Sequence, residues 1–174
     1  MANLTEKTVK SIHGRLIVSC QAAPGSPIDR PEILAAMAQT AVENGAVAIR
    51  ANHGVNIAEI RKAVKAPIIG LKKRDVEGFE VYITPEWRDV LEVYEAGANI
   101  IALDATFRPR PGDLDFSALC QKIHSELHGI LVMADVATFD EGVAAAECGA
   151  DFVGTTMNGY TANTASDLKN GANI

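Results

Sequence analysis

The sequence predicts the α/β class and, within it, a (β/α)8 TIM barrel of which about six strand units are present in these 174 residues. Strand-like apolar runs and helical patterns alternate five times before a sixth apolar run, which is typical of a parallel sheet. Gly-Ala followed by an apolar run recurs at Gly45, Gly97 and Gly149, 52 residues apart each time. Each interval holds two strand–helix units, and equal units favour a barrel over an open doubly wound sheet.

The first units begin with a helix over residues 3–12, which we expect to pack against one end of the domain, and a strand near Arg15–Ser19. Asp29 fits the N-cap of the next helix, with Glu32 as its capping-box partner, and Gly45 fits the C-cap. The following elements are a strand at Ala46–Arg50, a helix near Asn56–Lys65 and a strand at Pro67–Leu71.

The middle of the chain contains a longer excursion over Val76–Ile83, in which Glu80–Ile83 is predicted to add an edge strand. Thr84 is then predicted to cap a helix that has Pro85 at its first position and stops at Gly97.

The last units comprise a strand at Ile100–Leu103, a helix over Asp115–His128 and a strand at Ile130–Ala134. A second capping box, Thr138 with Glu141, opens a helix that ends at Gly149, and a strand at Asp151–Val153 follows. The polar stretch 157–174 carries no predicted element.

A closed barrel needs eight strand–helix units, and this chain supplies five and a strand. Continuing the 52-residue interval from Gly149 leads beyond Ile174. We therefore expect a single partial barrel domain over residues 1–174, without strands 7 and 8. Such a remnant has two open strand edges, which favour aggregation or pairing with partner strands.

Composition narrows the function. The net charge of −6 and the pI near 5.2 argue against a general nucleic-acid binder. No apolar run approaches the roughly 20 residues that span a bilayer, so no membrane partner is expected. Three widely spaced cysteines without a Cys-x-x-Cys pattern indicate a reducing, cytoplasmic location, and Cys20 is expected to be a small buried hydrophobic residue.

Polar residues follow the same end of the apolar runs. Arg50, the pair Lys72-Lys73, Asp104 and Asp135 end four successive runs; Gln21 follows the first run, and Thr155 and Thr156 follow the sixth. Ligands of barrels bind beyond the carboxyl ends of the strands, so these residues predict one shared pocket. The set suits acid–base chemistry and anion binding rather than a metal. Strand alternation directs only one of the two lysines inward, and the pattern alone does not choose.

Nine ordered blocks of this sequence closely resemble the bacterial N-acetylmannosamine-6-phosphate 2-epimerases. The blocks are Ser19–Gln21, Gly45–Asn52, Gly70–Asp75, Val81–Pro85, Ile101–Thr106, Arg108–Pro111, Met133–Asp135, Asp151–Thr156 and Gly159–Thr161. The resemblance covers about Arg15–Thr161. It implies a (β/α)8 barrel that inverts C2 of an N-acetylhexosamine 6-phosphate in sialic acid catabolism, without a metal or redox cofactor.

The resemblance also assigns roles to residues. It matches the catalytic lysine of the family to Lys73, and pocket residues that contact the sugar to Gln21, Arg50 and Asp135. Thr155, Thr156 and Tyr160 fall near the expected substrate, and Asp104 is a further candidate for substrate binding.

One departure bears on activity: the family's acid glutamate lies on strand 7, and its phosphate site follows strands 7 and 8. We therefore expect this polypeptide alone to be inactive or nearly so, and we expect homo-oligomers.

Alternatives remain open. Arg108 and Arg110 form a stiff basic loop, for which attraction of a phosphorylated sugar competes with simple solvation. The chain is also compatible with another phosphate-sugar barrel, such as a ribulose-phosphate epimerase or a thiamin-phosphate-type enzyme. A non-catalytic binding or assembly fragment is the third alternative. A substrate panel and light scattering would separate these.

Overall fold

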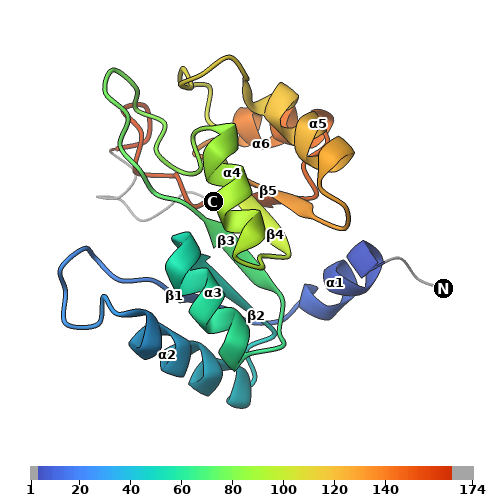
Figure 1. The fold of residues 1–174 in the computed structure, drawn as a ribbon. Helices are drawn as coiled ribbons and strands as arrows, with labels where there is room; N and C mark the ends of the chain where they lie inside the picture. The colour runs from blue at the N-terminus through green and yellow to red at the C-terminus, as the bar shows by residue number, and fades with distance from the viewer. Residues whose placement is uncertain (1–3, 166–174) are drawn as a thin grey trace.

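A computed structural model describes residues 4–165, in which six parallel strands form one curved sheet (Figure 1). The strands are β1 (Ile17–Cys20), β2 (Ala48–Asn52), β3 (Ile68–Leu71), β4 (Ile100–Asp104), β5 (Leu131–Asp135) and β6 (Phe152–Gly154). The helices are α1 (Leu4–Ile12), α2 (Pro31–Glu43), α3 (Gly54–Ala63), α4 (Trp87–Glu95), α5 (Phe116–Glu126) and α6 (Phe139–Glu147).

Each strand pairs with the next one along the chain, so the order in the sheet is β1-β2-β3-β4-β5-β6. This is the order of six successive units of a (β/α)8 barrel, and the described residues form an open half-barrel with α2–α6 on its outer side (Figure 1). The predicted fold class is confirmed, and apart from the edge strand predicted at Glu80–Ile83 the predicted elements agree with the observed ones to within a few residues.

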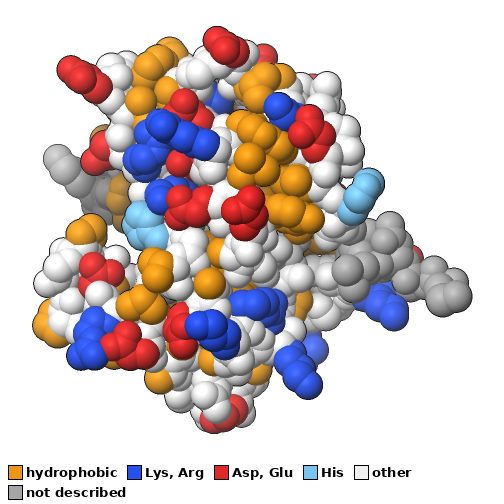
Figure 2. All heavy atoms as spheres, in the orientation of Figure 1, with side chains coloured by type: hydrophobic (Ala, Val, Ile, Leu, Met, Phe, Trp, Pro, Cys, Tyr) orange, Lys and Arg blue, Asp and Glu red, His pale blue; other side chains and the backbone are white. Residues whose placement is uncertain are grey.

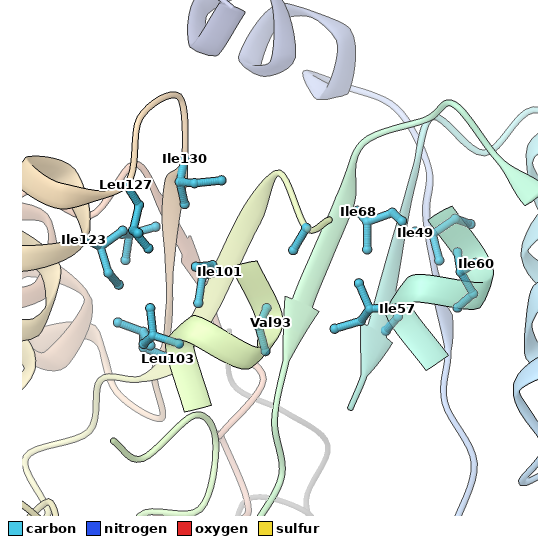
Figure 3. Packing of buried hydrophobic residues seen from close by; sticks show 14 of the residues in the cluster. Ile49, Ile57, Ile60, Ile68, Val93, Ile101, Leu103, Ile123, Leu127 and Ile130 are labelled. Atoms are coloured by element: carbon cyan, nitrogen blue, oxygen red, sulfur yellow. The ribbon is translucent and has the colours of Figure 1, made fainter. Parts of the chain in front are cut away.

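Two apolar layers lie on opposite faces of the sheet. The outer layer fills the space between strands and helices with buried side chains such as Ile49, Ile101 and Leu103, which contact the helical residues Ile57 and Ile123 (Figure 3). Cys20 belongs to this layer and is buried, as predicted. The outer layer is therefore what holds the helices on the sheet.

The inner layer consists of side chains that alternate with those of the outer layer along each strand. Its members include Ala48, Ile69, Ile100 and Leu131, all near the beginnings of their strands. Ile12 of α1 packs among them, so α1 covers the end of the half-barrel where the strands begin (Figure 1). The opposite end, where the strands finish, is left for polar residues.

The predicted capping boxes have different outcomes. Thr138 and Glu141 form the predicted box at the start of α6. The prediction for Asp29 was wrong: α2 begins with Arg30 at its N-cap, without a side-chain cap bond, and Asp29 instead accepts a hydrogen bond from the Gly25 amide. The turn at 25–29 competes for the carboxylate, so this local signature does not start the helix.

Two predictions for the excursion after β3 were also wrong. Thr84 is not the cap of α4; the helix begins two residues later than expected, behind a capping box of Glu86 and Asp89. Glu80–Ile83 does not form an edge strand. Its end lies between β3 and β4 instead: Lys73 and Ile83 form an antiparallel bridge, and the Asp104 amide donates to the Ile83 carbonyl oxygen (3.0 Å).

After β6 the described chain continues in turns as far as residue 165, and the rest of the polar stretch 157–174 lies outside the described residues. Within residues 4–165, no helix combines the length and hydrophobicity that a bilayer crossing requires. On the face shown in Figure 2, basic and acidic side chains lie close together rather than separated by sign.

Candidate active site

The finishing ends of the strands direct polar side chains to the inner face. Counting by two along β2 from the inward Ala48 reaches Arg50. The same count reaches Asp104 on β4 from Ala102 and Asp135 on β5 from the half-buried Met133. Asp104 and Asp135 are register partners across β4 and β5, so two carboxylates stand side by side at this end of the sheet.

Arg50 and Asp135 form a two-pronged ion pair across the inner face. Arg50 Nη1 donates to Asp135 Oδ1 (3.1 Å) and Nη2 donates to Oδ2 (2.6 Å). The Asp135 side chain is 0% exposed and that of Arg50 is 12% exposed. Parallel hydrogen bonds of this kind fix the orientation of both groups. The guanidinium is therefore held at a defined place above the inner apolar layer.

Asp104 has its own guanidinium partner. Arg108 Nη2 donates to Asp104 Oδ2 (2.7 Å), and the Thr106 hydroxyl donates to Oδ1 (2.7 Å). Arg110 donates to the backbone carbonyl oxygens of Thr84, Pro85 and Asp104. Solvation of Arg108 and Arg110 in a free basic loop is thus not what is observed, because both arginines tie that loop to the ends of the strands.

The two adjacent lysines have different surroundings. Lys72 Nζ contacts both carboxylate oxygens of Glu92 on α4 (2.6 and 2.8 Å), and Glu92 Oε1 also accepts from the Gly54 amide (3.0 Å). Lys72 therefore faces the helices. Lys73 lies two residues beyond the inward Leu71 and is on the other face.

Lys73 lines a cavity of about 520 Å³ at the end of the strands, together with Gln21, Asn52, His53 and Tyr82. Burial lowers the pKa of the Lys73 ammonium, the positive charge of Arg50 lowers it further, and the carboxylate of Asp135 opposes both. A lysine whose pKa is depressed has a larger neutral fraction near pH 7 and can act as a base.

Gln21 brings an unused acceptor to this cavity. Its Nε2 donates to the Ser19 hydroxyl (2.9 Å), whereas its buried Oε1 has no hydrogen-bond partner within residues 4–165. A buried acceptor without a partner is costly and calls for an explanation. A donor on a bound ligand would supply the missing hydrogen bond.

None of the three predicted residues after β6 lines the cavity of Lys73, although the charge of Tyr160 acts on Tyr82, which does line it. Thr155 lines a separate, mainly apolar cavity beside α6, with Phe139 and Val153. Thr156 is exposed, and the Tyr160 side chain is 64% exposed on the turn that follows. The structure thus brings Gln21, Arg50, Lys73, Asp104 and Asp135 to one end of the sheet, and Thr155 does not join them.

Two residues of the site were missed by sequence reasoning. Asn52 is buried, and its Oδ1 accepts from the Lys73 amide (2.8 Å). Counting by two from Arg50 places Asn52 on the same face, so the sequence held a signal for it. Tyr82 comes from the excursion after β3, and burial followed by the charge of Asp104 raises the pKa of its phenol. No local pattern pointed to Tyr82.

Comparison with known proteins identifies the family of this chain. A family model described as "Putative N-acetylmannosamine-6-phosphate epimerase" matches residues 34–171. A relative from Salmonella typhimurium, named "Putative N-acetylmannosamine-6-phosphate 2-epimerase 1", is 49% identical over 161 residues, which are 91% of this chain and 70% of the relative. A relative from Thermosynechococcus vestitus with the same name but no number is 53% identical over 154 residues, 88% of this chain and 66% of the relative.

Comparison with solved structures indicates the same family. The N-acetylmannosamine-6-phosphate 2-epimerase from Clostridium perfringens superposes with a TM-score of 0.84 at 38% identity, covering 95% of this chain and 76% of that one. A phosphonomutase-like protein from Burkholderia cenocepacia, at 16% identity and a TM-score of 0.56, shares the fold alone. The chain belongs to the N-acetylmannosamine-6-phosphate epimerase family.

Proposed function

We propose that this protein is an isomerase that interconverts the 6-phosphates of N-acetylmannosamine and N-acetylglucosamine by moving a proton at C2, with Lys73 as the base. The observation that supports the assignment of the base is the position of Lys73: it lines the cavity at the end of the strands, and burial and the charge of Arg50 lower its pKa.

The chemistry follows from the acidity of the substrate. When the sugar ring is open, C2 lies next to the C1 aldehyde, and this makes the C2 proton removable. Neutral Lys73 takes the proton, and the electron pair of the C–H bond moves to the C1 oxygen as an enolate. A proton returned to the opposite face of C2 gives the other epimer and restores the aldehyde. Positive charge from Arg50 stabilises the enolate, because its position is fixed in advance.

Other residues of the cavity fit a hydrogen-bonding role toward the sugar. The free Oε1 of Gln21 suits a hydroxyl or the N-acetyl N–H as a donor. The Tyr82 phenol, whose pKa is raised, stays protonated at neutral pH and can donate. The cavity size of about 520 Å³ lies within the usual range of ligand sites, roughly 300–1,000 Å³.

The test is a proton NMR assay that follows conversion of either epimer in D2O. Because the family resemblance implies that the phosphate site follows strands 7 and 8, residues 1–165 are joined to the corresponding last part of the Salmonella relative. We expect this chimera to interconvert the epimers and residues 1–174 alone to give no measurable turnover.

Variants of the two lysines test which of them is the catalytic base. Lys73→Ala in the chimera should abolish conversion, whereas Lys72→Arg, which keeps the partner of Glu92, should retain most of it. The kcat/KM of the parent should rise with pH through the lowered pKa of Lys73, since only the neutral amine accepts a proton. Full activity of Lys73→Ala would overturn the assignment of the base, and an inactive parent chimera would overturn the proposed reaction. The homo-oligomer and the cytoplasmic location stay predictions, the first of which light scattering tests.

A further inference from the structure

Thr84 occupies an unusual place for a threonine. It lies between the ends of β3 and β4, its side chain is 0% exposed, and its backbone φ is +46°. Positive φ is a genuine outlier for a β-branched residue and persists only where the surroundings enforce it. Because Pro85 follows directly, the conformation of Thr84 is restricted further.

The amide and the hydroxyl of Thr84 bind the backbone of the segment after β3 and of β4. Its amide donates to the Lys72 carbonyl oxygen (2.7 Å), and its hydroxyl accepts from the Lys72 amide (3.1 Å). The same hydroxyl donates to the Ala102 carbonyl oxygen of β4 (2.7 Å). Thr84 thus binds both polar groups of the Lys72 backbone, the carbonyl through its amide and the amide through its hydroxyl, and the hydroxyl also links this segment to β4.

The residue after Lys72 is held from the other side. The Lys73 amide donates to Asn52 Oδ1 on β2 (2.8 Å), and the Lys72 side chain is held outward by Glu92. The peptide units on either side of Lys72 are therefore fixed by β2 and by Thr84, and the next side chain in line faces the inner cavity. Thr84 is not among the residues that line the cavity, so any effect on chemistry passes through the backbone of this segment.

We propose that Thr84 is a positioning residue whose hydroxyl holds the Lys72-Lys73 backbone so that the Lys73 amine faces the cavity. This inference rests on the proposed function, in which Lys73 is the base. If Thr84 only filled space between β3 and β4, the shape of its side chain would be enough and the hydroxyl would not be needed. The two roles differ in what the hydroxyl contributes, and this difference can be measured.

The test uses three variants of the 174-residue chain. Thr84→Val keeps the shape and removes the hydroxyl, Thr84→Ser keeps the hydroxyl and removes the methyl group, and Lys65→Arg serves as a distant control. The lysines are labelled competitively with dinitrofluorobenzene between pH 6 and 11, and each is quantified by mass spectrometry. This readout reports the titration of Lys73 without requiring turnover.

We expect Lys73 of the parent and of Thr84→Ser to titrate below the other lysines. In Thr84→Val the Lys73 curve should move toward that of the exposed Lys65, because a loosened segment lets water reach the amine. In the chimera, kcat of Thr84→Val should fall about 10- to 100-fold with little change in KM, as expected for a misplaced catalytic group, and Thr84→Ser should restore most of it.

The outcomes are distinguishable. If Thr84→Val folds and its Lys73 curve and kcat match the parent, the positioning role is refuted while the epimerase proposal stands. If Thr84→Val does not fold, Thr84→Ser decides: parental titration and kcat support the role of the hydroxyl, and a curve shifted to that of Lys65 refutes it. If Lys73→Ala retains activity in the chimera, the proposed base fails even where the labelling curves behave as expected.

Discussion

The buried pair Arg50–Asp135 offers a prediction whose size follows from the structure. Asp135→Asn removes one charge and keeps the shape, which leaves the guanidinium of Arg50 at 12% exposure without a counter-charge. Removing one partner of a buried pair destabilises a protein by about 3–5 kcal/mol. We expect the lower value, because one oxygen of Asn still accepts a hydrogen bond. At roughly 2–4 °C per kcal/mol for a domain of this length, Tm should fall by about 6–12 °C.

The same pair leads to a second prediction: substituting its two members should shift the pKa of Lys73 in opposite directions. The Asp135 carboxylate raises the pKa of Lys73 and the Arg50 guanidinium lowers it. Asp135→Asn should therefore lower the pKa of Lys73 further, while Arg50→Gln should raise it. Both variants should lose stability, so the direction of the pKa change cannot be a by-product of unfolding.

Thermal unfolding followed by circular dichroism gives Tm, and competitive labelling of lysines gives the pKa direction. The double variant Arg50→Met with Asp135→Leu completes a thermodynamic cycle and should lose less stability than the two single variants together, because no buried charge remains. A Tm for Asp135→Asn within about 1 °C of the parent, less than one kcal/mol by the same conversion, would refute the burial argument. Shifts of the Lys73 pKa in the same direction in both variants would refute the electrostatic one.

Three further predictions concern packing, capping and pH. A Cβ on Gly70 would lie 2.6 Å from Val93 Cγ1. Gly70→Ala should therefore lower the free energy of unfolding, measured in urea, by about 1–3 kcal/mol. Gly142→Ala in α6 is the control and should be nearly neutral, because its Cβ would lie 3.3 Å from the exposed Val153. Thr138→Ala removes the side-chain acceptor at the start of α6 and should lower the free energy of unfolding by about 1 kcal/mol; an unchanged value would show that the cap is dispensable. The pKa of His53 is lowered by burial and then by the charge of Lys72, so the unfolded chain binds the proton more readily and stability should fall as pH drops below the usual value of 6.5. His53→Asn, which tolerates the positive φ at this position, should flatten that decline, and an equally steep decline would contradict the assignment.

The fold could be predicted from the sequence because the sequence patterns that indicate it are local and repeated. Apolar runs and the polar residues after them recur with every unit, and helix stops at Gly45, Gly97 and Gly149 recur with every second unit. Which residues face inward could be predicted wherever a polar residue interrupted an apolar run, as at Arg50. The inward lysine of the pair Lys72-Lys73 could not be predicted, because both faces of β3 are buried. The apolar run before the lysines therefore contains no polar residue that marks one face.

The parts that could not be predicted depend on contacts between distant segments. Thr84 followed by Pro85 has the local form of a helix start, yet its hydroxyl finds the Ala102 carbonyl 18 residues away and the cap fails. Arg108 looks like a solvated loop residue until the loop folds back onto Asp104. In both cases a buried polar group of a neighbouring strand competes successfully with water, and only the three-dimensional arrangement reveals it.

In the proposed reaction, inversion at C2 requires a proton donor on the face opposite Lys73, and the described inner face supplies few. Asp104 and Asp135 are each engaged by a guanidinium, so their carboxylate oxygens already accept hydrogen bonds from arginine. The Tyr82 phenol is held protonated, yet it comes from the excursion that runs antiparallel to the segment carrying Lys73. The six described strands form one side of a barrel, and in the proposed reaction Lys73 acts from that side. We propose that the donor facing Lys73 across the axis comes from units that close the barrel, and the chimera, which contains such units, should turn over substrate only if that donor is present.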